Sequence, residues 1–381
     1  MKTAHTRPKA LIGVMIGMSI ILVAGCATLP QDAGFKDVQA TVMKRTGERI
    51  EWNRGTDEDA VAQAAVEQLL SGQLNTDEAV QIALLNNRQL QATYEDLGLA
   101  QANLVQAGLL GNPVFDARVL LPIGGGSLEL GFGIVQDFLS ILYRPLRKRI
   151  AAAQFDAAKR RVAGAVIDLA AQTRTAFYEL QAYQQRFEFL QQVVKSTAAS
   201  AEAAQRLYDA GNITNLDLAR EQAFYQQSRL ALATVEVRLI QDRERLNSLM
   251  GLWGKDTQWS IASRLPEIPN QPLKLADLET RAIAASLSLG AARKKILGAA
   301  GVLGFTNASA LVPFVAPGLD AERRVGEWEL GPTFSLPLPI FNQGQARIAA
   351  ARSDLRRAQQ RYWAQAVQIR AAVRAARASV L

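Results

Sequence analysis

Histidine and cysteine are almost absent from this chain of 381 residues, which has one of each, His5 and Cys26. His5 lies in an N-terminal segment that we expect to be removed, so the mature chain has no imidazole and a single thiol. Catalytic Cys–His and Ser–His pairs require an imidazole, and structural zinc sites combine several cysteines and histidines. A lone cysteine also excludes an internal disulfide. We therefore predict no catalytic residue, no metal site and no enzymatic activity.

Long apolar runs are scarce as well. Although 49% of the residues are hydrophobic, no run after residue 25 reaches the roughly 18 residues of a membrane-spanning helix. The formal net charge is +8, but removing three of the 43 basic residues with the N-terminal segment leaves 40 against 35 acidic ones. These charges are interleaved along helical patterns, which favours solvated faces over a nucleic-acid partner. A polytopic helical membrane protein and a nucleic-acid-binding protein are both disfavoured.

Residues 1–25 have the pattern of a lipoprotein signal peptide. Basic residues precede a short apolar segment over 10–23, and Val23-Ala24-Gly25-Cys26 has the small residues of a lipoprotein cleavage site. Cleavage would make Cys26 the first mature residue, and acyl chains on it would hold the protein at a bilayer. The alternative is an incidental cysteine behind an ordinary signal peptide. We predict a covalent lipid on Cys26, no other cofactor, and an outer-membrane location, because Ala27 replaces the Asp that commonly retains lipoproteins in the inner membrane.

The sequence contains an internal repeat. Arg149 to Ala153 returns as Arg347 to Ala351, and each copy follows a Gly-x-x-Gly segment and a pair of alternating segments. Two copies of helix, β-hairpin and long helix account for this order. We expect an N-terminal periplasmic arm over 26–75, a first repeat over 76–251, a linker over 252–272 and a second repeat over 273–381.

The first alternating pair predicts a β-hairpin over 113–136. Phe115, Ala117 and Val119 alternate with Asp116 and Arg118, the glycines 124–126 turn the chain, and Glu129 lies on the polar face of the return strand. Each arm is about the 9–11 residues that a tilted strand needs to cross a bilayer. A soluble hairpin packed on a core is the alternative.

The second alternating pair predicts a hairpin over 305–336. We expect a strand from Phe305 to Val315, a charged loop over 320–324, and a second strand with Glu327 and Glu329 on its polar face. Prolines in this region argue against a regular ladder. Four strands cannot close a membrane barrel, whose smallest members have eight strands, and open edges are not tolerated in lipid. Several chains must therefore contribute strands.

The remaining pattern is helical. Apolar positions from Val162 to Val194 step by alternating fours and threes, which is a coiled-coil seam. The turn at Asp209 to Asn212 divides a long helical hairpin over 146–250, and a further helix begins at about residue 343. The predicted fold is mainly α with a small β part, combining duplicated long coiled-coil helical hairpins with transmembrane β-hairpins.

These features together resemble the TolC outer-membrane-factor family, and most closely its CzcC-like heavy-metal efflux lipoproteins. The resemblance rests on the lipidation cysteine, the duplicated strand pairs and three local motifs: Ile82 to Asn87, Gln106 to Pro113, and Arg206 to Gly211 followed by Asp217. It covers nearly all of the chain from about Thr76 onward.

The resemblance implies a homotrimer with a 12-stranded β-barrel and an α-helical barrel. Such a channel is a passive conduit for metal cations or small toxic compounds, and it meets a periplasmic adaptor protein and an inner-membrane pump. The adaptor-docking or gating tip would comprise Arg206, Tyr208, Gly211 and Asp217. The barrel lumen would be lined by Asp116, Arg118, Glu129, Glu327 and Glu329. Two plainer interpretations remain open: Gly211 permits a turn, and Asp217 caps a helix.

The family also has a second helical hairpin, whereas Leu381 corresponds by the repeat to residue 183. We therefore expect the second repeat to be truncated, without a counterpart of residues 184–250. The competing class is a lipid-anchored coiled-coil scaffold of the envelope without channel activity. That class explains the cleavage site and the heptads but leaves the two amphipathic hairpins without a role.

Overall fold

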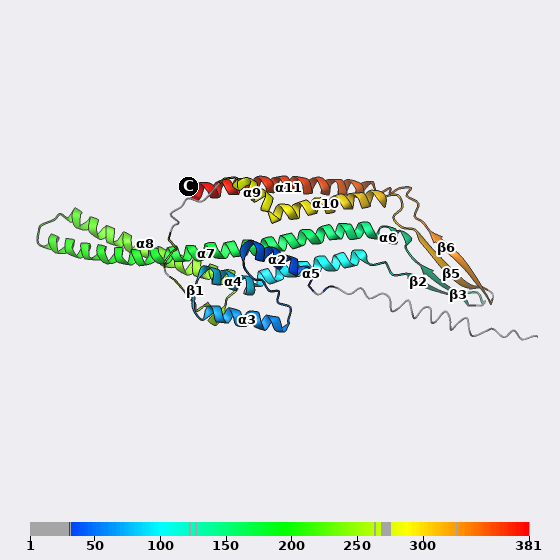
Figure 1. Cartoon of the computed structure of the whole chain (residues 1–381), viewed down its shortest axis with the longest axis horizontal. Helices are drawn as coiled ribbons and strands as arrows, with labels where there is room; N and C mark the ends of the chain where they lie inside the picture. Colours follow the sequence, from blue (N-terminus) through cyan, green and yellow to red (C-terminus); the bar gives the residue numbers. More distant parts are fainter. Residues whose placement is uncertain are drawn as a thin grey trace, which may run out of the picture. The chain divides into compact units, whose positions relative to one another are not determined.

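The computed structural model describes residues 30, 32–121, 123–125, 128–262, 264–267, 276–324 and 326–380 (Figure 1). The predicted signal peptide and Cys26 lie outside the described residues, as do residues 263 and 268–272 of the predicted linker. The chain divides into two compact units. Unit 1 contains Gly98–Ala157 and Ala292–Ala364, and unit 2 contains Gly34–Leu97, Ala158–Ala291 and Gln365–Leu381.

The N-terminal part of unit 2 is a set of short helices and one short strand. These are α2 (Phe35–Thr46), α3 (Asp57–Leu70), β1 (Gln73–Leu74), α4 (Thr76–Asn86) and α5 (Arg88–Gly108), the last of which continues into unit 1. Helix α4 begins where the sequence predicts, because Asn75 and Glu78 form a capping box. The Asn75 side chain accepts from the backbone N–H groups of Asp77 and Glu78, and the Glu78 carboxylate accepts from that of Asn75.

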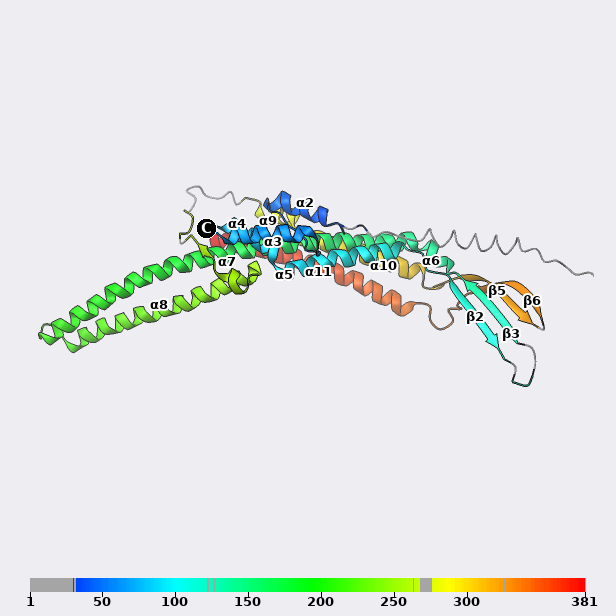
Figure 2. The same ribbon diagram turned by 90° about the horizontal axis from the view of Figure 1, so that it is seen from below.

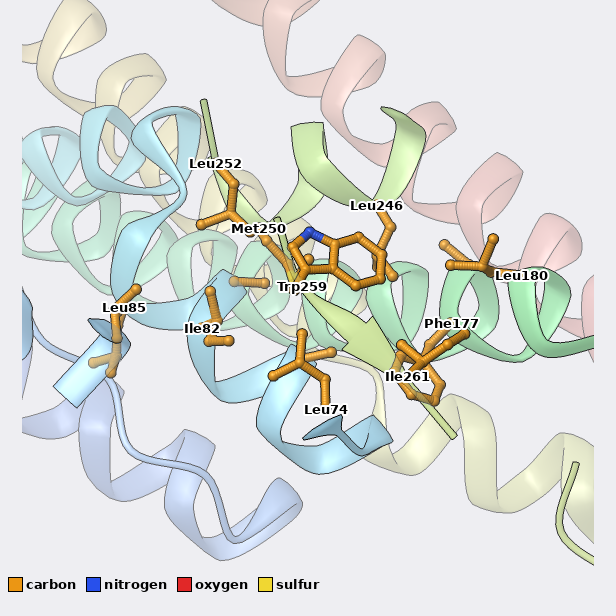
Figure 3. Close-up of a cluster of buried hydrophobic side chains, with 14 of the residues drawn as sticks. Leu74, Ile82, Leu85, Phe177, Leu180, Leu246, Met250, Leu252, Trp259 and Ile261 are labelled. Carbon is orange, nitrogen blue, oxygen red and sulfur yellow. The ribbon is translucent and has the colours of Figure 1, made fainter. Parts of the chain in front are cut away.

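The core of unit 2 joins segments that are far apart in the sequence. Strand β1 pairs in parallel with β4 (Ser260–Ile261). The side chains around this pair come from α3, α4, α7 (Arg144–Asp209) and α8 (Asn215–Met250) (Figure 3). The Trp259 indole lies among them, and its Nε1 donates to Asn247 Oδ1 at 2.7 Å. Its polar atom is therefore satisfied inside an apolar cluster. The large side chains of the cluster are Leu74, Ile82, Leu85, Phe177, Leu180, Leu246, Met250, Leu252, Trp259 and Ile261.

Two asparagines of the Ile82 to Asn87 motif form hydrogen bonds to the C-terminal end of α8 beside this core. Asn86 Nδ2 donates to the carbonyl oxygens of Met250 at 3.1 Å and Gly251 at 2.9 Å, and Asn87 Nδ2 donates to that of Leu249 at 2.9 Å. These carbonyls belong to the end of helix α8, where they lack intrahelical partners. The motif therefore satisfies the C-terminus of α8 from the α4–α5 junction.

The predicted helical hairpin consists of α7 (Arg144–Asp209) and α8 (Asn215–Met250), preceded by α6 (Phe138–Leu142). Figures 1 and 2 show α8 lying along the distal part of α7. The predicted seam is buried at Val162, Val166, Ala176 and Leu180. Thr173 fills the polar position in the seam and donates its hydroxyl to the Leu169 carbonyl at 2.9 Å.

Polar contacts join the helices of this hairpin at several levels, and two of them lie away from its tip. The hydroxyls of Thr197 on α7 and Ser228 on α8 lie 2.8 Å apart in a buried contact. Closer to the core, Arg245 of α8 forms an ion pair with Glu179 of α7 at 2.6 Å. The two contacts lie at different levels along the same pair of helices.

Unit 1 contains a four-stranded antiparallel sheet in the order β2-β3-β5-β6. Strands β2 and β3 have seven residues each, fewer than the 9–11 expected, and β5 and β6 have nine. Pro113 and Pro122 bracket β2, and proline cannot donate to a ladder. The strands are β2 (Val114–Leu120), β3 (Glu129–Val135), β5 (Ala316–Arg324) and β6 (Glu327–Ser335).

The prediction for the second hairpin is wrong at its first strand. Residues 305–308 belong to helix α10 (Leu287–Ala308), and the predicted charged loop over 320–324 lies inside β5. The turn instead includes Gly326, which has a φ of +95°. The acids of β5 alternate with Leu319 and Ala321, so a strand with one polar face accommodates them.

The second Gly-x-x-Gly segment, Gly301 to Gly304, lies inside α10. Gly301 allows close packing, because a Cβ there would lie 2.7 Å from Cγ1 of Ile150 on α7. The remaining elements are η1 (Gly254–Thr257), α9 (Leu278–Ala285) and α11 (Gln345–Val380). Among the described residues, no helix is long and apolar enough to cross a membrane.

Candidate functional site

One face of the sheet gathers the charged residues of all four strands. Residues that pair in register lie on the same face, and the pairing produces two charged rows. The row nearer the helices is Asp116, Gly133, Asp320 and Gly331, and the next is Arg118, Gly131, Glu322 and Glu329. Glu129, Arg324 and Glu327 occupy positions on this face beside the turns. All five predicted lumen residues therefore share this polar face.

Two acids of the polar face, Asp320 and Glu322, were missed from the sequence. They were assigned to a loop because four of the five residues over 320–324 are charged. Their alternation with Leu319, Ala321 and Arg323 is the signal that could have placed them on a strand. With them, the polar face holds six acidic positions against Arg118 and Arg324.

A glycine makes room for one acid on this face. A Cβ at Gly133 would lie 2.6 Å from Asp320 Oδ1, so the carboxylate lies over the glycine of the neighbouring strand. Gly131 pairs in register with Glu322 and Gly331 with Asp320, but a Cβ at either would have no acid within 4 Å. Within the described residues, no group of three Asp, Glu, His or Cys side chains is arranged to hold a metal ion.

The opposite face of the sheet is apolar and exposed. Phe115 is 65% exposed and Leu330 is 76% exposed. The Phe132 ring stacks between Phe115 and Trp328, with centroids 6.1 Å and 6.0 Å away. Strands β2 and β6 form the two edges of this sheet. One apolar face, one charged face and two open edges are the properties of a wall segment between lipid and water that requires neighbouring strands.

The turn between α7 and α8 brings together the predicted tip residues. The backbone N–H of Gly211 donates to the Tyr208 carbonyl and that of Asn212 to the Leu207 carbonyl, each at 2.8 Å. This is the Schellman arrangement, which requires a left-handed residue after the helix, and Gly211 has a φ of +76°. Arg206, in the last helical turn, pairs with Glu202.

Asp217 lies at the start of α8 as part of a capping box. Its carboxylate accepts from the Thr214 hydroxyl at 2.6 Å and the Thr214 backbone N–H at 3.2 Å, and its own N–H donates to Thr214 Oγ1. These hydrogen bonds lower the pKa of Asp217, and Arg220 adds to the effect. The stabilisation of the folded state by these hydrogen bonds is therefore present above the ordinary carboxyl pKa, and it is lost as the pH falls through the lowered pKa of Asp217. Thr214 is the N-cap, and Asp217 completes the box.

A groove lies between α7 and α8 close to this turn. Its volume is about 610 Å³. Alanines of both helices form its apolar lining, and glutamines and Glu202 border it, with Gln222 Nε2 donating to Gln205 Oε1 at 3.3 Å. Small side chains leave the space that longer ones would fill. This groove was not predicted from the sequence, although Ala198 and Ala201 on α7 and Ala219 and Ala223 on α8 line it.

The helical hairpin also carries a family signature. Residues 142–252 match the family of outer membrane efflux proteins. The cobalt-zinc-cadmium resistance protein CzcC of Cupriavidus metallidurans is 24% identical over 309 residues, which cover 78% of this chain and 71% of that protein. The similarity therefore extends well beyond the hairpin.

Solved channel structures have the same fold. The CmeC outer membrane channel of Campylobacter jejuni superimposes with a TM-score of 0.65 at 15% identity, covering 92% of this chain and 77% of that one. The outer-membrane channel OprN gives 0.61 at 16% identity, covering 86% and 76%. The hairpin therefore carries the signature of outer membrane efflux proteins, and the chain is similar in sequence to CzcC and in fold to solved outer-membrane channels.

Proposed function

We propose that three copies of this chain form one passive conduit, with the polar face of each sheet lining the lumen. The observation that carries the proposal is the amphipathic sheet with edges at β2 and β6. Joining β6 of one copy to β2 of the next gives 12 strands from three copies of four, which removes the open edges. The apolar face then contacts lipid.

Metal cations are the proposed cargo. CzcC is named for cobalt, zinc and cadmium resistance, and the polar face of this chain has six acidic positions against two arginines. An excess of one charge along a pore concentrates the opposite ion without holding it tightly. A conduit needs such weak attraction, because a strongly bound ion would leave slowly.

Ion selectivity tests the conduit and its lining together. The full chain in planar bilayers should give stepwise conductance that favours cations, and Glu129→Gln or Glu322→Gln should shift the reversal potential toward anion permeation. Arg118→Gln on the same face should shift it the other way. Insertion without conductance would support the envelope scaffold instead, and conductance unaffected by all three substitutions would place the lumen elsewhere.

The second part of the proposal is a lipid anchor on Cys26. The supporting observation is the Val23-Ala24-Gly25-Cys26 pattern behind a basic and apolar segment. Wild-type cells should incorporate labelled palmitate into the protein, and Cys26→Ser should abolish the label and alter processing of the N-terminal segment. Palmitate label that persists in Cys26→Ser would contradict a lipid anchor on Cys26.

The third part is that a periplasmic adaptor, coupled to an inner-membrane pump, docks at the α7–α8 tip. The groove supports this, because it combines an apolar lining with polar rims and lies beside Arg206, Tyr208, Gly211 and Asp217. A helical partner fits such a groove by its apolar face.

Filling the groove tests the docking proposal. Ala223→Trp should greatly reduce cross-linking to a periplasmic adaptor of the same bacterium while trimers still form, because the indole occupies the groove. Ala233→Trp is the matched control, since Ala233 is an exposed alanine on α8 outside the groove. Equal cross-linking of the two variants would move the docking surface away from the tip.

A further inference from the structure

Arg323 lies on the face of the sheet that is otherwise apolar. Its register partners are Leu130 on β3 and Trp328 on β6, and Val119 continues the row on β2. By register, every other described strand residue on this face is uncharged. Arg323 is therefore the one charged residue among the described strand residues of the face that contacts lipid in the proposed barrel.

The acids of the sheet do not neutralise Arg323. Glu322 and Glu329 lie on the polar face, because successive strand residues alternate between faces. Arg323 is exposed and forms no ion pair with the residues that the structure describes. A cation facing lipid without a protein partner is stable only where it reaches polar headgroups or water.

The position of Arg323 along β5 indicates which leaflet of the membrane it would contact. It lies one residue before the end of β5, next to the hairpin turn. The ends of the four strands opposite the turns lead to the helices (Figure 1). Because the helices of an outer-membrane efflux channel extend into the periplasm, the turns of membrane-crossing strands emerge on the cell exterior. Arg323 is then level with the outer leaflet.

Trp328, the register partner of Arg323 on β6, has the properties of a residue at the membrane interface. It is 55% exposed beside Arg323 and continues the stacked row of Phe115 and Phe132. Tryptophan is enriched where lipid chains meet headgroups. The planar guanidinium of arginine presents paired N–H donors that match two oxygens of one phosphate.

We propose that Arg323 and Trp328 bind a phosphate-bearing glycolipid of the outer leaflet. The guanidinium holds the phosphate, and the indole packs against the lipid where its headgroup meets its acyl chains. Three copies of the chain provide three such positions around the barrel. The inference rests on the proposed function, since it requires the apolar face to contact lipid.

Lipid retention tests this assignment. The full chain is reconstituted in phosphatidylcholine vesicles that contain a minor fraction of lipid A, extracted in mild detergent, and analysed by native mass spectrometry. Wild type should retain about fivefold more lipid A per chain than Arg323→Gln, as expected for one arginine near an anionic surface. Arg323→Lys should recover part of the loss. Arg118→Gln, which removes the same charge from the polar face, should behave as wild type.

Two further lipids decide the chemistry. Dephosphorylated lipid A should be retained no better by wild type than by Arg323→Gln, and phosphatidylglycerol should compete poorly. Equal retention of phosphorylated and dephosphorylated lipid A, or equal competition by phosphatidylglycerol, would overturn the assignment. The phosphorylation comparison uses wild type alone, so it decides even if a variant fails to insert. Inserted wild type without any lipid preference contradicts only this inference, whereas failure to insert in every vesicle contradicts the barrel.

Discussion

Leu330→Arg is expected to raise the free energy of membrane insertion by about 2–4 kcal/mol, the cost of a lipid-facing arginine near the bilayer midplane. Leu330 is in the middle row of the apolar face with Ala117, Phe132 and Ala321. Its side chain is 76% exposed, so the substitution removes little packing and mainly adds a charge. The measurement is the inserted fraction in vesicles across a urea titration.

Glu329→Arg is the matched control for this prediction. It introduces the same side chain one residue earlier, on the polar face, and should insert nearly as well as wild type. Val119→Arg lies in the row of Arg323 beside the turns and should cost only about 0–1 kcal/mol, because the penalty falls toward the interface. Equal losses in Leu330→Arg and Glu329→Arg would indicate a sheet that does not separate lipid from water.

Gly251→Ala should destabilise unit 2 by about 2–5 kcal/mol, combining left-handed strain of about 1–2 with overpacking of about 1–3. Gly251 ends α8 with a φ of +68°, and a Cβ there would lie 2.7 Å from the backbone oxygen of Asn86. The clash would push the α4–α5 junction away from the carbonyls that Asn86 and Asn87 satisfy. Urea unfolding followed by tryptophan fluorescence measures the loss.

Gly211→Ala separates the two contributions. Gly211 has a similar φ of +76°, but nothing lies within 4 Å of a Cβ placed there. Only the strain of about 1–2 kcal/mol should therefore appear. If both alanine variants lose the same stability, the contact between Gly251 and Asn86 contributes nothing.

The long hairpin was predictable because its signal is local and repeated. Positions from Val162 to Leu180 step by threes and fours, and a helix with that spacing must bury one stripe. Asn75 and Glu78 likewise predict the start of α4 from four consecutive residues. The first β-hairpin followed from alternation around a glycine turn, although prolines on both sides shorten β2.

The second hairpin shows where local signals conflict. Charge over 320–324 indicated a loop, and a strand was expected from Phe305 to Val315. In the structure the charges occupy the polar face of β5, and Gly301 admits Ile150 from a neighbouring helix. The role of the charged residues and the role of Gly301 both depend on a structural neighbour that is distant in the sequence. For the same reason, the charged rows and the tip groove could not be derived from one segment alone.

The two polar contacts of the α7–α8 hairpin that lie away from its tip restrict how that hairpin can move. A slip of one heptad would displace one helix by about 10 Å along the other. It would break both the Thr197–Ser228 contact and the Glu179–Arg245 ion pair. Axial sliding therefore loses contacts at two levels, whereas bending of the whole hairpin keeps both. We expect any opening at the tip to move both helices together.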